Sequence, residues 1–111
     1  MVKPIHPKRF EIYWVNLDHT VGAEVKKTRP CVVISPDSMN QGLLTVIIAP
    51  MTTTTKDWPF RIPITHKKIH GQIMLDQIRT VSKKRLHRVD GRVSPKVKVD
   101  LFECLNHMFM Q

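Results

Sequence analysis

The feature that most constrains the fold is a change in the spacing of apolar residues near position 94. Before it, apolar residues come in short runs rich in β-branched and aromatic side chains, which is typical of strands. After Ser94-Pro95, a helix N-cap followed by proline in the first turn, they follow a helical period. The predicted helix face carries Val97, Leu101, Cys104, Leu105 and Met108, with Phe102 and Phe109 beside it. The pattern predicts a mainly β domain with a C-terminal α-helix, in which the helix closes one side of a small, strongly curved sheet or barrel.

The predicted strands are short and separated by turn residues. They cover residues 10–17, 31–35, 43–51, 60–64, 71–75, 77–81 and 86–93. The run 43–51 is almost continuously apolar, as in a strand buried on both faces, whereas Pro63 indicates an edge or bulged strand. Between two strands, residues 36–42 form a turn with one helical turn, for which Asp37 or Ser38 is the predicted cap.

The chain of 111 residues is expected to be a single domain over residues 1–111, because it contains no repeat, linker or low-complexity tract. No run approaches the ~18 apolar residues of a membrane helix, and no apolar segment follows the basic N-terminus. We therefore expect a cytoplasmic protein without membrane association. Cys31 and Cys104 are then expected to be buried free thiols. His66 and His70 lack a third ligand in the sequence around them, so we expect no metal site.

The net charge of +9 is unevenly distributed. Residues 79–98 hold eight lysines and arginines against one acid, Asp90. Such a stretch is either a solvated face or a phosphate-binding surface. A basic excess of this size in a small domain favours a polyanionic partner.

A polar loop between the first two strands carries Glu24 and Arg29. A loop fixed to a sheet at both ends can hold a carboxylate and a guanidinium over one surface. Later segments add the hydroxyls of Thr52 and Thr53 and a second carboxylate, Asp76, followed by Arg79. Metal-free RNA cleavage needs a proton acceptor for the 2′-hydroxyl, donors for the phosphorane oxygens and a proton donor for the leaving group. These segments together suggest an RNA-cleaving site.

Several ordered motifs carry a resemblance to a known family. They are Tyr13-Trp-Val-Asn-Leu-Asp18, Gly22-x-Glu24 with Lys27-Thr-Arg29-Pro30, Asn40, Ala49-Pro-Met-Thr52-Thr53, Gly71-Gln-Ile-Met-Leu-Asp76-Gln77-Ile-Arg79-Thr80 and Lys84-Arg85-Leu86. In this order and spacing the chain resembles the MazF/PemK/Kid family of toxin endoribonucleases from residue 9 to about 109. Each motif alone is weak, but their joint occurrence is specific.

The resemblance implies an SH3-like barrel of the CcdB/MazF plasmid-maintenance toxin type, assembled as a homodimer. It also implies a toxin that inhibits translation and growth by cleaving single-stranded RNA at short sequence motifs without a metal or other cofactor. The 2′-hydroxyl route would leave a 2′,3′-cyclic phosphate and a 5′-hydroxyl. The implied partners are single-stranded RNA and a cognate acidic, MazE-like antitoxin.

The resemblance assigns the principal catalytic roles to Arg29 and Thr52. Glu24 and Asp76 are further catalytic candidates, each either a proton acceptor or the carboxylate that holds an arginine in place, and His19 is a titrating group near the same loop. The expected partner of Asp76 is a residue such as Arg79. Candidate RNA-binding residues are Lys27, Thr53, Trp58, Gln77, Arg79 and Arg85, with Trp58 stacking on a base and Trp14 in the core.

The chain departs from the family pattern at four positions. The Kid-like branch has a histidine where this chain has Ala23 and an arginine where it has Met74, so that branch's acid and base roles do not transfer. Phe10 replaces a frequent glycine, and His19 replaces the usual proline.

Two alternatives to a nuclease remain: a toxin that binds and poisons DNA gyrase, as CcdB does, and an inactive RNA-binding module. CcdB-type function depends on a C-terminal Trp-Gly-Ile, whereas this chain ends in residues 107–111, His-Met-Phe-Met-Gln.

Overall fold

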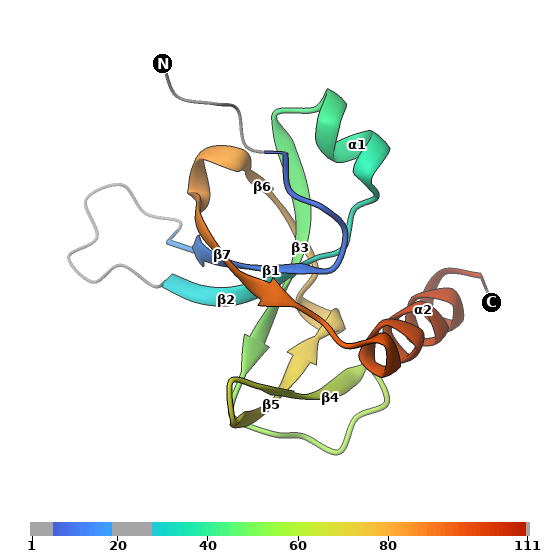
Figure 1. The fold of residues 1–111 in the computed structure, drawn as a ribbon. Helices are drawn as coiled ribbons and strands as arrows, with labels where there is room; N and C mark the ends of the chain where they lie inside the picture. Colours follow the sequence, from blue (N-terminus) through green and yellow to red (C-terminus); the bar gives the residue numbers. More distant parts are fainter. Residues whose placement is uncertain (1–5, 19–27, 111) are drawn as a thin grey trace.

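The computed structural model describes residues 6–18 and 28–110, which form one curved sheet with two helices (Figure 1). The strands are β1 (Glu11–Asn16), β2 (Thr28–Val33), β3 (Thr45–Thr52), β4 (Arg61–His66), β5 (Ile69–Met74), β6 (Arg79–Ser82) and β7 (Leu86–Arg92). The helices are α1 (Asp37–Gly42) and α2 (Pro95–Phe109), and single 3₁₀ turns cover η1 (Leu75–Gln77) and η2 (Lys83–Arg85). The predicted fold class, mainly β with a C-terminal helix, is confirmed.

The strands form an antiparallel sheet in the order β4-β5-β3-β2-β1-β7, and β6 pairs with the first half of β3. The central strand β3 therefore has β2 along one edge, with β6 and then β5 along the other. Its neighbouring residues Ile48 and Ala49 belong to different hydrophobic clusters, so both faces of β3 are buried as its apolar run predicts. β4, which contains Pro63, is an edge strand, also as predicted.

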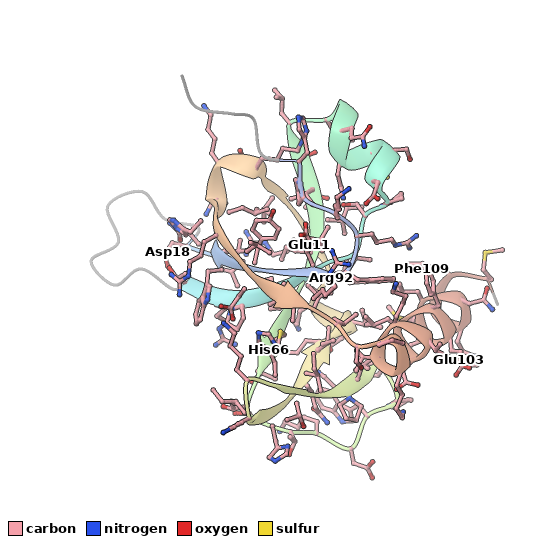
Figure 2. All side chains as sticks on the ribbon, viewed as in Figure 1. Glu11, Asp18, His66, Arg92, Glu103 and Phe109 are labelled. Atoms are coloured by element: carbon pink, nitrogen blue, oxygen red, sulfur yellow. The ribbon has the colours of Figure 1, made fainter. Side chains whose placement is uncertain are left out.

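The helix α2 covers one of the two hydrophobic clusters. Ser94 Oγ accepts a hydrogen bond from the backbone N–H of Val97 at 3.3 Å, which confirms the predicted N-cap. Val97 and Leu101 are buried against β4 and the first cluster, and burial of each such side chain contributes about 2 kcal/mol. The far end of the helix is exposed, including Phe109, which lies at the outside of the molecule (Figure 2).

Phe10 adopts a backbone conformation that is typical of glycine. Phe10 has φ 69°, in the left-handed region that non-glycine residues rarely occupy. Its ring is buried and contacts Phe102 of α2 edge-to-face, with ring centroids 5.0 Å apart. Burial of an aromatic ring in such a pair offsets the backbone strain.

The predicted cap of α1 is wrong. The N-cap residue is Pro36, whose side chain has no acceptor to cap the helix. Asp37 Oδ1 instead accepts a hydrogen bond from the backbone N–H of the distant Arg9 at 2.7 Å. The helix is held by buried Asn40, whose amide donates to the carbonyls of Pro7 and Ser35, both at 2.9 Å. Local sequence does not reveal such tertiary partners.

The two cysteines lie on β2 and α2. Cys31 is fully buried and Cys104 half-buried, and both are free thiols. In the described part of the chain, no helix is long and apolar enough to cross a membrane.

An acidic side chain connects β4 and β7, the two edge strands in the strand order of the sheet. Asp90 on β7 accepts hydrogen bonds from Lys67 Nζ at 2.7 Å and from His66 Nε2 at 3.0 Å, and His66 ends β4. Figure 2 shows His66 between the β4–β5 hairpin and β7. We call these contacts the Asp90 bridge; they link β7 to the β4–β5 hairpin across the seam of the curved sheet.

The hairpin turn that supplies this bridge has an unusual backbone. His66 pairs with Ile69, so the turn consists of Lys67 and Lys68, and both have positive φ (50° and 68°). Two-residue turns of this kind normally use Asn-Gly, because lysine is strained there. The ion pair of Lys67 with Asp90 helps to hold this strained turn.

The bridge makes Asp90 a strong acid. Hydrogen bonds from Lys67 and then from His66 lower the pKa of Asp90 to about 2, against the opposing effect of burial. The carboxyl is therefore ionised throughout the physiological range, and only 10% of its side chain is exposed. Because Asp90 is ionised, Nε2 of His66 is the donor in their hydrogen bond.

Replacing Asp90 with asparagine should remove part of the acid sensitivity of the protein. The pKa of Asp90 is depressed from 3.8, so its stabilising effect is present above pH 4 and is lost as the pH falls toward 2. Solvent screening of the exposed Lys67 ammonium limits this contribution to roughly 1 kcal/mol. Urea denaturation should show the free-energy difference between wild type and Asp90→Asn shrinking by that amount between neutral pH and pH 2.

Asp100→Asn is the matched control, since Asp100 pairs with exposed Lys96 within α2. This variant keeps Asp90, so its free energy of unfolding should retain the contribution of Asp90 that is lost at low pH. A wild-type to Asp90→Asn difference that does not change with pH would contradict the role given to the bridge.

Candidate active site

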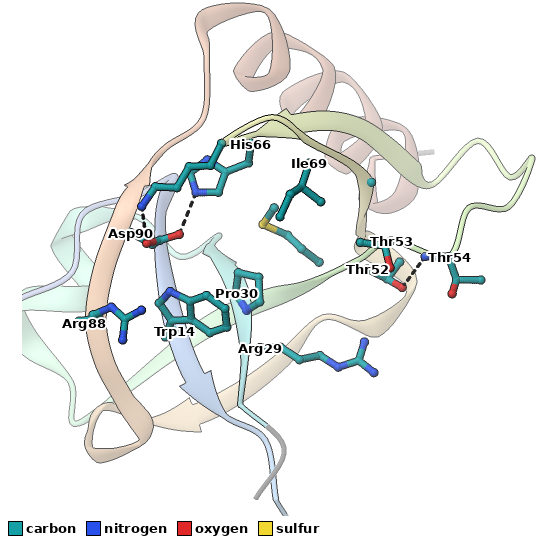
Figure 3. A pocket seen from close by; sticks show the side chains of 13 residues that line it. Trp14, Arg29, Pro30, Thr52, Thr53, Thr54, His66, Ile69, Arg88 and Asp90 are labelled. Atoms are coloured by element: carbon teal, nitrogen blue, oxygen red, sulfur yellow. Dashed lines mark hydrogen bonds and ion pairs between the residues drawn. The ribbon is translucent and has the colours of Figure 1, made fainter.

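A groove of about 590 Å³ opens beside the centre of the sheet. Its walls come from β1, β2, the end of β3, the β4–β5 hairpin and β7 (Figure 3). The Asp90 bridge and Arg88 lie at one end, and Arg29 with the residues that follow β3, Thr53 and Thr54, lies at the other. The groove therefore brings together strands that are distant in the sequence.

Arg29 and Thr52, the two principal sequence-predicted residues, both line this groove. The pairing of β2 with β3 ends at Cys31 opposite Pro50. Continuing that register by two residues on each strand places Arg29 opposite Thr52. Pro30 has no N–H to extend the ladder, so the groove opens where the strands stop pairing.

The hydroxyl of Thr52 has a defined orientation. Its Oγ1 accepts a hydrogen bond from the backbone N–H of Thr54 at 3.1 Å, which leaves the hydroxyl proton available for a ligand. On the next strand, a Cβ at Gly71 would lie 2.3 Å from the carbonyl oxygen of Thr52. Glycine at position 71 therefore permits the close approach of β5 that fixes the end of β3.

Asp76 is placed outside the set of groove-lining residues. It lies on η1, where both carboxylate oxygens accept hydrogen bonds from Arg61, at 2.6 and 3.0 Å. Arg61 first, and Gln77 with a smaller effect, lower the pKa of Asp76. The expectation that a residue such as Arg79 would be its partner is corrected: the observed partner, Arg61, comes from the neighbouring strand, where it pairs with Met74.

Trp58 belongs to this second cluster rather than to the groove. The Arg61 guanidinium lies 4.6 Å from the centre of the Trp58 ring, and Lys56 Nζ lies 5.7 Å from it. Gln77, another predicted RNA-binding residue, donates to Asp76 at 3.2 Å. With Trp58 43% exposed, the cluster offers an aromatic surface flanked by cations.

The remaining predicted arginines bind backbone at the end of β1. Arg79 Nη1 donates to the carbonyl of Leu17 at 3.4 Å, and Arg85 Nη1 donates to the carbonyls of Asn16 and Asp18. These bonds hold the segment that leads into residues 19–27. Glu24 and Lys27, together with His19 and Ala23, lie outside the described residues.

The thiol beneath Arg29 is unsuited to be a nucleophile. Burial raises the pKa of Cys31 to about 12, although the guanidinium groups of Arg29 and Arg79 lower it. Cys31 is completely inaccessible, so its thiol is a core group.

Sequence reasoning missed the far end of the groove. Trp14, expected in the core, lines the groove, and the Arg88 guanidinium lies 5.3 Å from the centre of its ring. The buried indole N–H of Trp14 faces Asp90 (Figure 3) and makes no hydrogen bond of ordinary geometry. The many lysines and arginines of residues 79–98 indicated an anion-binding surface that includes Arg88. No sequence pattern indicated that the β4–β5 turn would bring His66 and Lys67 to the groove.

The charges of the groove suit an anionic ligand. Among the described residues that line it, Arg29, Lys67 and Arg88 are cationic, and the single carboxylate is that of Asp90, which is already paired. Within the described ranges, no three His, Cys, Asp or Glu side chains come together as metal ligands. The described groups that line the groove and can donate to an anion include the Arg29 guanidinium and the Thr52 hydroxyl.

Known proteins match almost the whole chain. Residues 8–109 match the family described as "PemK-like, MazF-like toxin of type II toxin-antitoxin system". "Endoribonuclease toxin MazF" of Escherichia coli strain K12 is 30% identical over 97 residues, which cover 86% of this chain and 87% of that protein. "Endoribonuclease MazF9" of Mycobacterium tuberculosis is 34% identical over 110 residues, covering 88% and 92%.

Solved structures match the fold. A MazE–MazF crystal structure from Deinococcus radiodurans has a TM-score of 0.81 at 21% identity, covering 97% of this chain and 99% of that one. A mycobacterial endoribonuclease in complex with its cognate antitoxin has a TM-score of 0.78 at 22% identity, covering 91% and 92%. With the family match over nearly its full length, the chain belongs to the PemK-like, MazF-like toxins of type II toxin–antitoxin systems.

Proposed function

We propose that this protein is a sequence-specific, metal-independent endoribonuclease that cleaves single-stranded RNA to 2′,3′-cyclic phosphate and 5′-hydroxyl ends. The observation that carries the proposal is the convergence of Arg29 and Thr52, from separate strands, on one cation-lined groove. The relatives from Escherichia coli and Mycobacterium tuberculosis are named endoribonucleases, which supports the same activity here.

Arg29 stabilises the transition state. Its guanidinium is always charged and presents paired donors that match two phosphoryl oxygens. Attack of the 2′-hydroxyl on the phosphate builds negative charge on those oxygens, and a fixed cation opposes it. The side chain is exposed in the groove, so a phosphate can reach it.

Thr52 supplies one further donor to the same phosphate. Because its oxygen already accepts the Thr54 N–H, its proton points to another acceptor. Thr53 lines the groove beside it and is proposed to contact the RNA.

The proton transfers of the cleavage reaction need a carboxylate, and Asp76 and Glu24 are the two candidates. Asp76 accepts hydrogen bonds from Nε and Nη2 of Arg61, so its role is to hold that arginine beside Trp58. We assign acceptance of the 2′-hydroxyl proton to Glu24, which lies five residues before Arg29 in the sequence; the carboxyl protonated in this way then gives the proton to the 5′-oxygen as the P–O5′ bond breaks. Further residues are proposed to bind RNA: Lys27, Arg79 and Arg85, together with Trp58 and Gln77 of the second cluster.

The proposed partners follow from the family. A mycobacterial endoribonuclease of the same fold is known with its cognate antitoxin, and we propose an acidic, MazE-like antitoxin for this basic chain. We also propose a cytoplasmic homodimer. Exposed apolar side chains on α2, including Phe102 and Phe109, support an interface there.

Purified protein should cut a long single-stranded RNA in excess EDTA. The groups proposed for catalysis are Arg29, Thr52 and Glu24, and none of them needs a metal to act. End mapping and mass spectrometry should find 2′,3′-cyclic phosphate and 5′-hydroxyl termini at a short recurring sequence. Thr52→Val protein prepared in the same way controls for contaminating nucleases. A strict requirement for Mg²⁺, or 5′-phosphate products, would overturn the chemistry.

Arg29→Ala should lower the cleavage rate by ~100-fold or more, the scale for losing one preorganised donor to a developing anion. The exposed position of Arg29 means that the variant should stay folded, as circular dichroism can verify. Arg92→Ala, which removes an exposed arginine outside the groove, is the matched control and should keep near wild-type activity. Equal losses in the two variants would indicate a general charge effect.

A further inference from the structure

Arg29 lies where its strand is paired on one side only. Among the described residues, β2 pairs with β3 from Cys31 onward, and Pro30 has no N–H to extend that ladder. The backbone of Arg29 is paired with Val15 of β1, and its carbonyl accepts a weak hydrogen bond from the Cys31 thiol at 3.6 Å. The position of the Arg29 guanidinium therefore depends on how firmly the end of β1 is held.

The end of β1 loses its other strand neighbour at the same level. Backbone pairing of β1 with β7 ends at Val15, opposite Leu86. Arg85 directly precedes Leu86 and belongs to η2. Its backbone is thus in a 3₁₀ turn rather than in the ladder, while its side chain still reaches β1.

Two arginines hold the three carbonyl groups of residues 16–18. Nη1 of Arg85 donates to the carbonyl of Asn16 at 3.2 Å and to that of Asp18. Nη1 of Arg79, on β6, donates to the intervening carbonyl of Leu17 at 3.4 Å. Successive carbonyls of an extended chain point in opposite directions, so neighbouring carbonyls go to different arginines. We call these bonds the arginine clamp; they continue, with side chains, the support that backbone N–H groups give to the rest of β1.

The bonds of Arg85 are suited to fixing a position. Arg85 is half-buried, and hydrogen bonds from a charged donor are shorter and stronger than those from a neutral one. Asn16 Oδ1 accepts the backbone N–H of Asp18 at 2.9 Å, so the two carbonyls that share Nη1 are also fixed relative to each other. The planar guanidinium donates in defined directions, which a lysine ammonium does not.

We propose that Arg85 is a positioning residue for Arg29. Asn16, whose carbonyl Arg85 holds, pairs with Thr28, the residue directly before Arg29. By fixing Asn16, the arginine clamp fixes the start of β2 and holds the Arg29 guanidinium where the phosphate reacts. This inference rests on the proposed endoribonuclease function and gives Arg85 a role beyond its RNA contact. The bonds to β1 use Nη1, so the other nitrogens of Arg85 can serve that contact.

The two roles of Arg85 affect different kinetic constants. A cation that contacts a phosphate binds it before and during the reaction alike, so its loss raises KM and is overcome by saturating RNA. A displaced Arg29 no longer meets the charge that develops in the transition state, so kcat falls.

Arg85→Ala should lower kcat at saturating RNA by about tenfold or more, because a misplacement of about 1 Å can cost ~100-fold. Lys84→Ala is the matched control, since it removes a neighbouring exposed cation of η2 and should keep kcat. Arg85→Lys should recover KM but not kcat, because the lysine side chain ends one atom short of Nη1. A raised KM with an unchanged kcat in Arg85→Ala would leave only the RNA contact and overturn the inference.

A double-mutant cycle shows whether Arg85 acts through Arg29. In an Arg29→Ala background no guanidinium is left to position, so Arg85→Ala should lower kcat by less than about twofold. The same fold loss in both backgrounds would show that Arg85 acts independently and would overturn the inference. Arg85→Lys takes the place of Arg85→Ala in the cycle if circular dichroism shows that the alanine variant is unfolded.

Hydrogen exchange tests the arginine clamp without any cleavage. Backbone amides of residues 13–18 and 28–31 should exchange about tenfold faster in Arg85→Ala than in Lys84→Ala, because local opening at the paired ends of β1 and β2 becomes easier. Unchanged exchange in these segments would overturn the inference whether or not the protein cuts RNA. The expected difference in exchange, in a protein whose wild type cuts no RNA, would support the clamp and contradict the proposed enzyme.

Discussion

The site depends on one carboxylate that joins the two ends of a curved sheet. Asp90 on β7 binds His66 and Lys67 of the β4–β5 hairpin, and no backbone pairing links these strands among the described residues. The contact closes the seam, holds a strained turn and faces the indole of Trp14. Its low pKa keeps it ionised, so the bridge persists at neutral pH. The far wall of the groove is a consequence of this bridge.

The near wall depends on backbone register. β2 and β3 pair up to Cys31 and Pro50, and the same register brings Arg29 opposite Thr52 just beyond the last pair. Gly71 lets β5 approach Thr52 from the other edge of β3. A guanidinium and a hydroxyl thus line one groove because β2 begins where β3 ends. The burial of Ile48 and Ala49 on opposite faces of β3 anchors that place in the core.

The strands and the C-terminal helix could be predicted because their signals are local: apolar runs, Pro63 at an edge and the Ser94-Pro95 cap. The Lys67-Lys68 turn could not, since it owes its conformation partly to a distant ion pair rather than to turn residues. The same reason explains the wrong cap of α1 and the unexpected partner of Asp76. Of the predicted site, Arg29, Thr52 and Thr53 converge on the groove, while Asp76, Gln77 and Trp58 form a second cluster. Trp14 was misplaced because a half-buried aromatic residue in a strand has the same local pattern in a core and in a groove wall.

The central claim is that Arg29 and Thr52 act on one phosphate in one transition state. A double-mutant cycle measures this directly, using cleavage rates of wild type, Arg29→Ala, Thr52→Val and the double variant on the same RNA. Groups that act as a unit give non-additive losses. We predict that the double variant is hardly slower than the slower single variant, and falls short of the product of the two losses by about tenfold or more. Losses that multiply would show that the two residues act independently and would contradict a shared site.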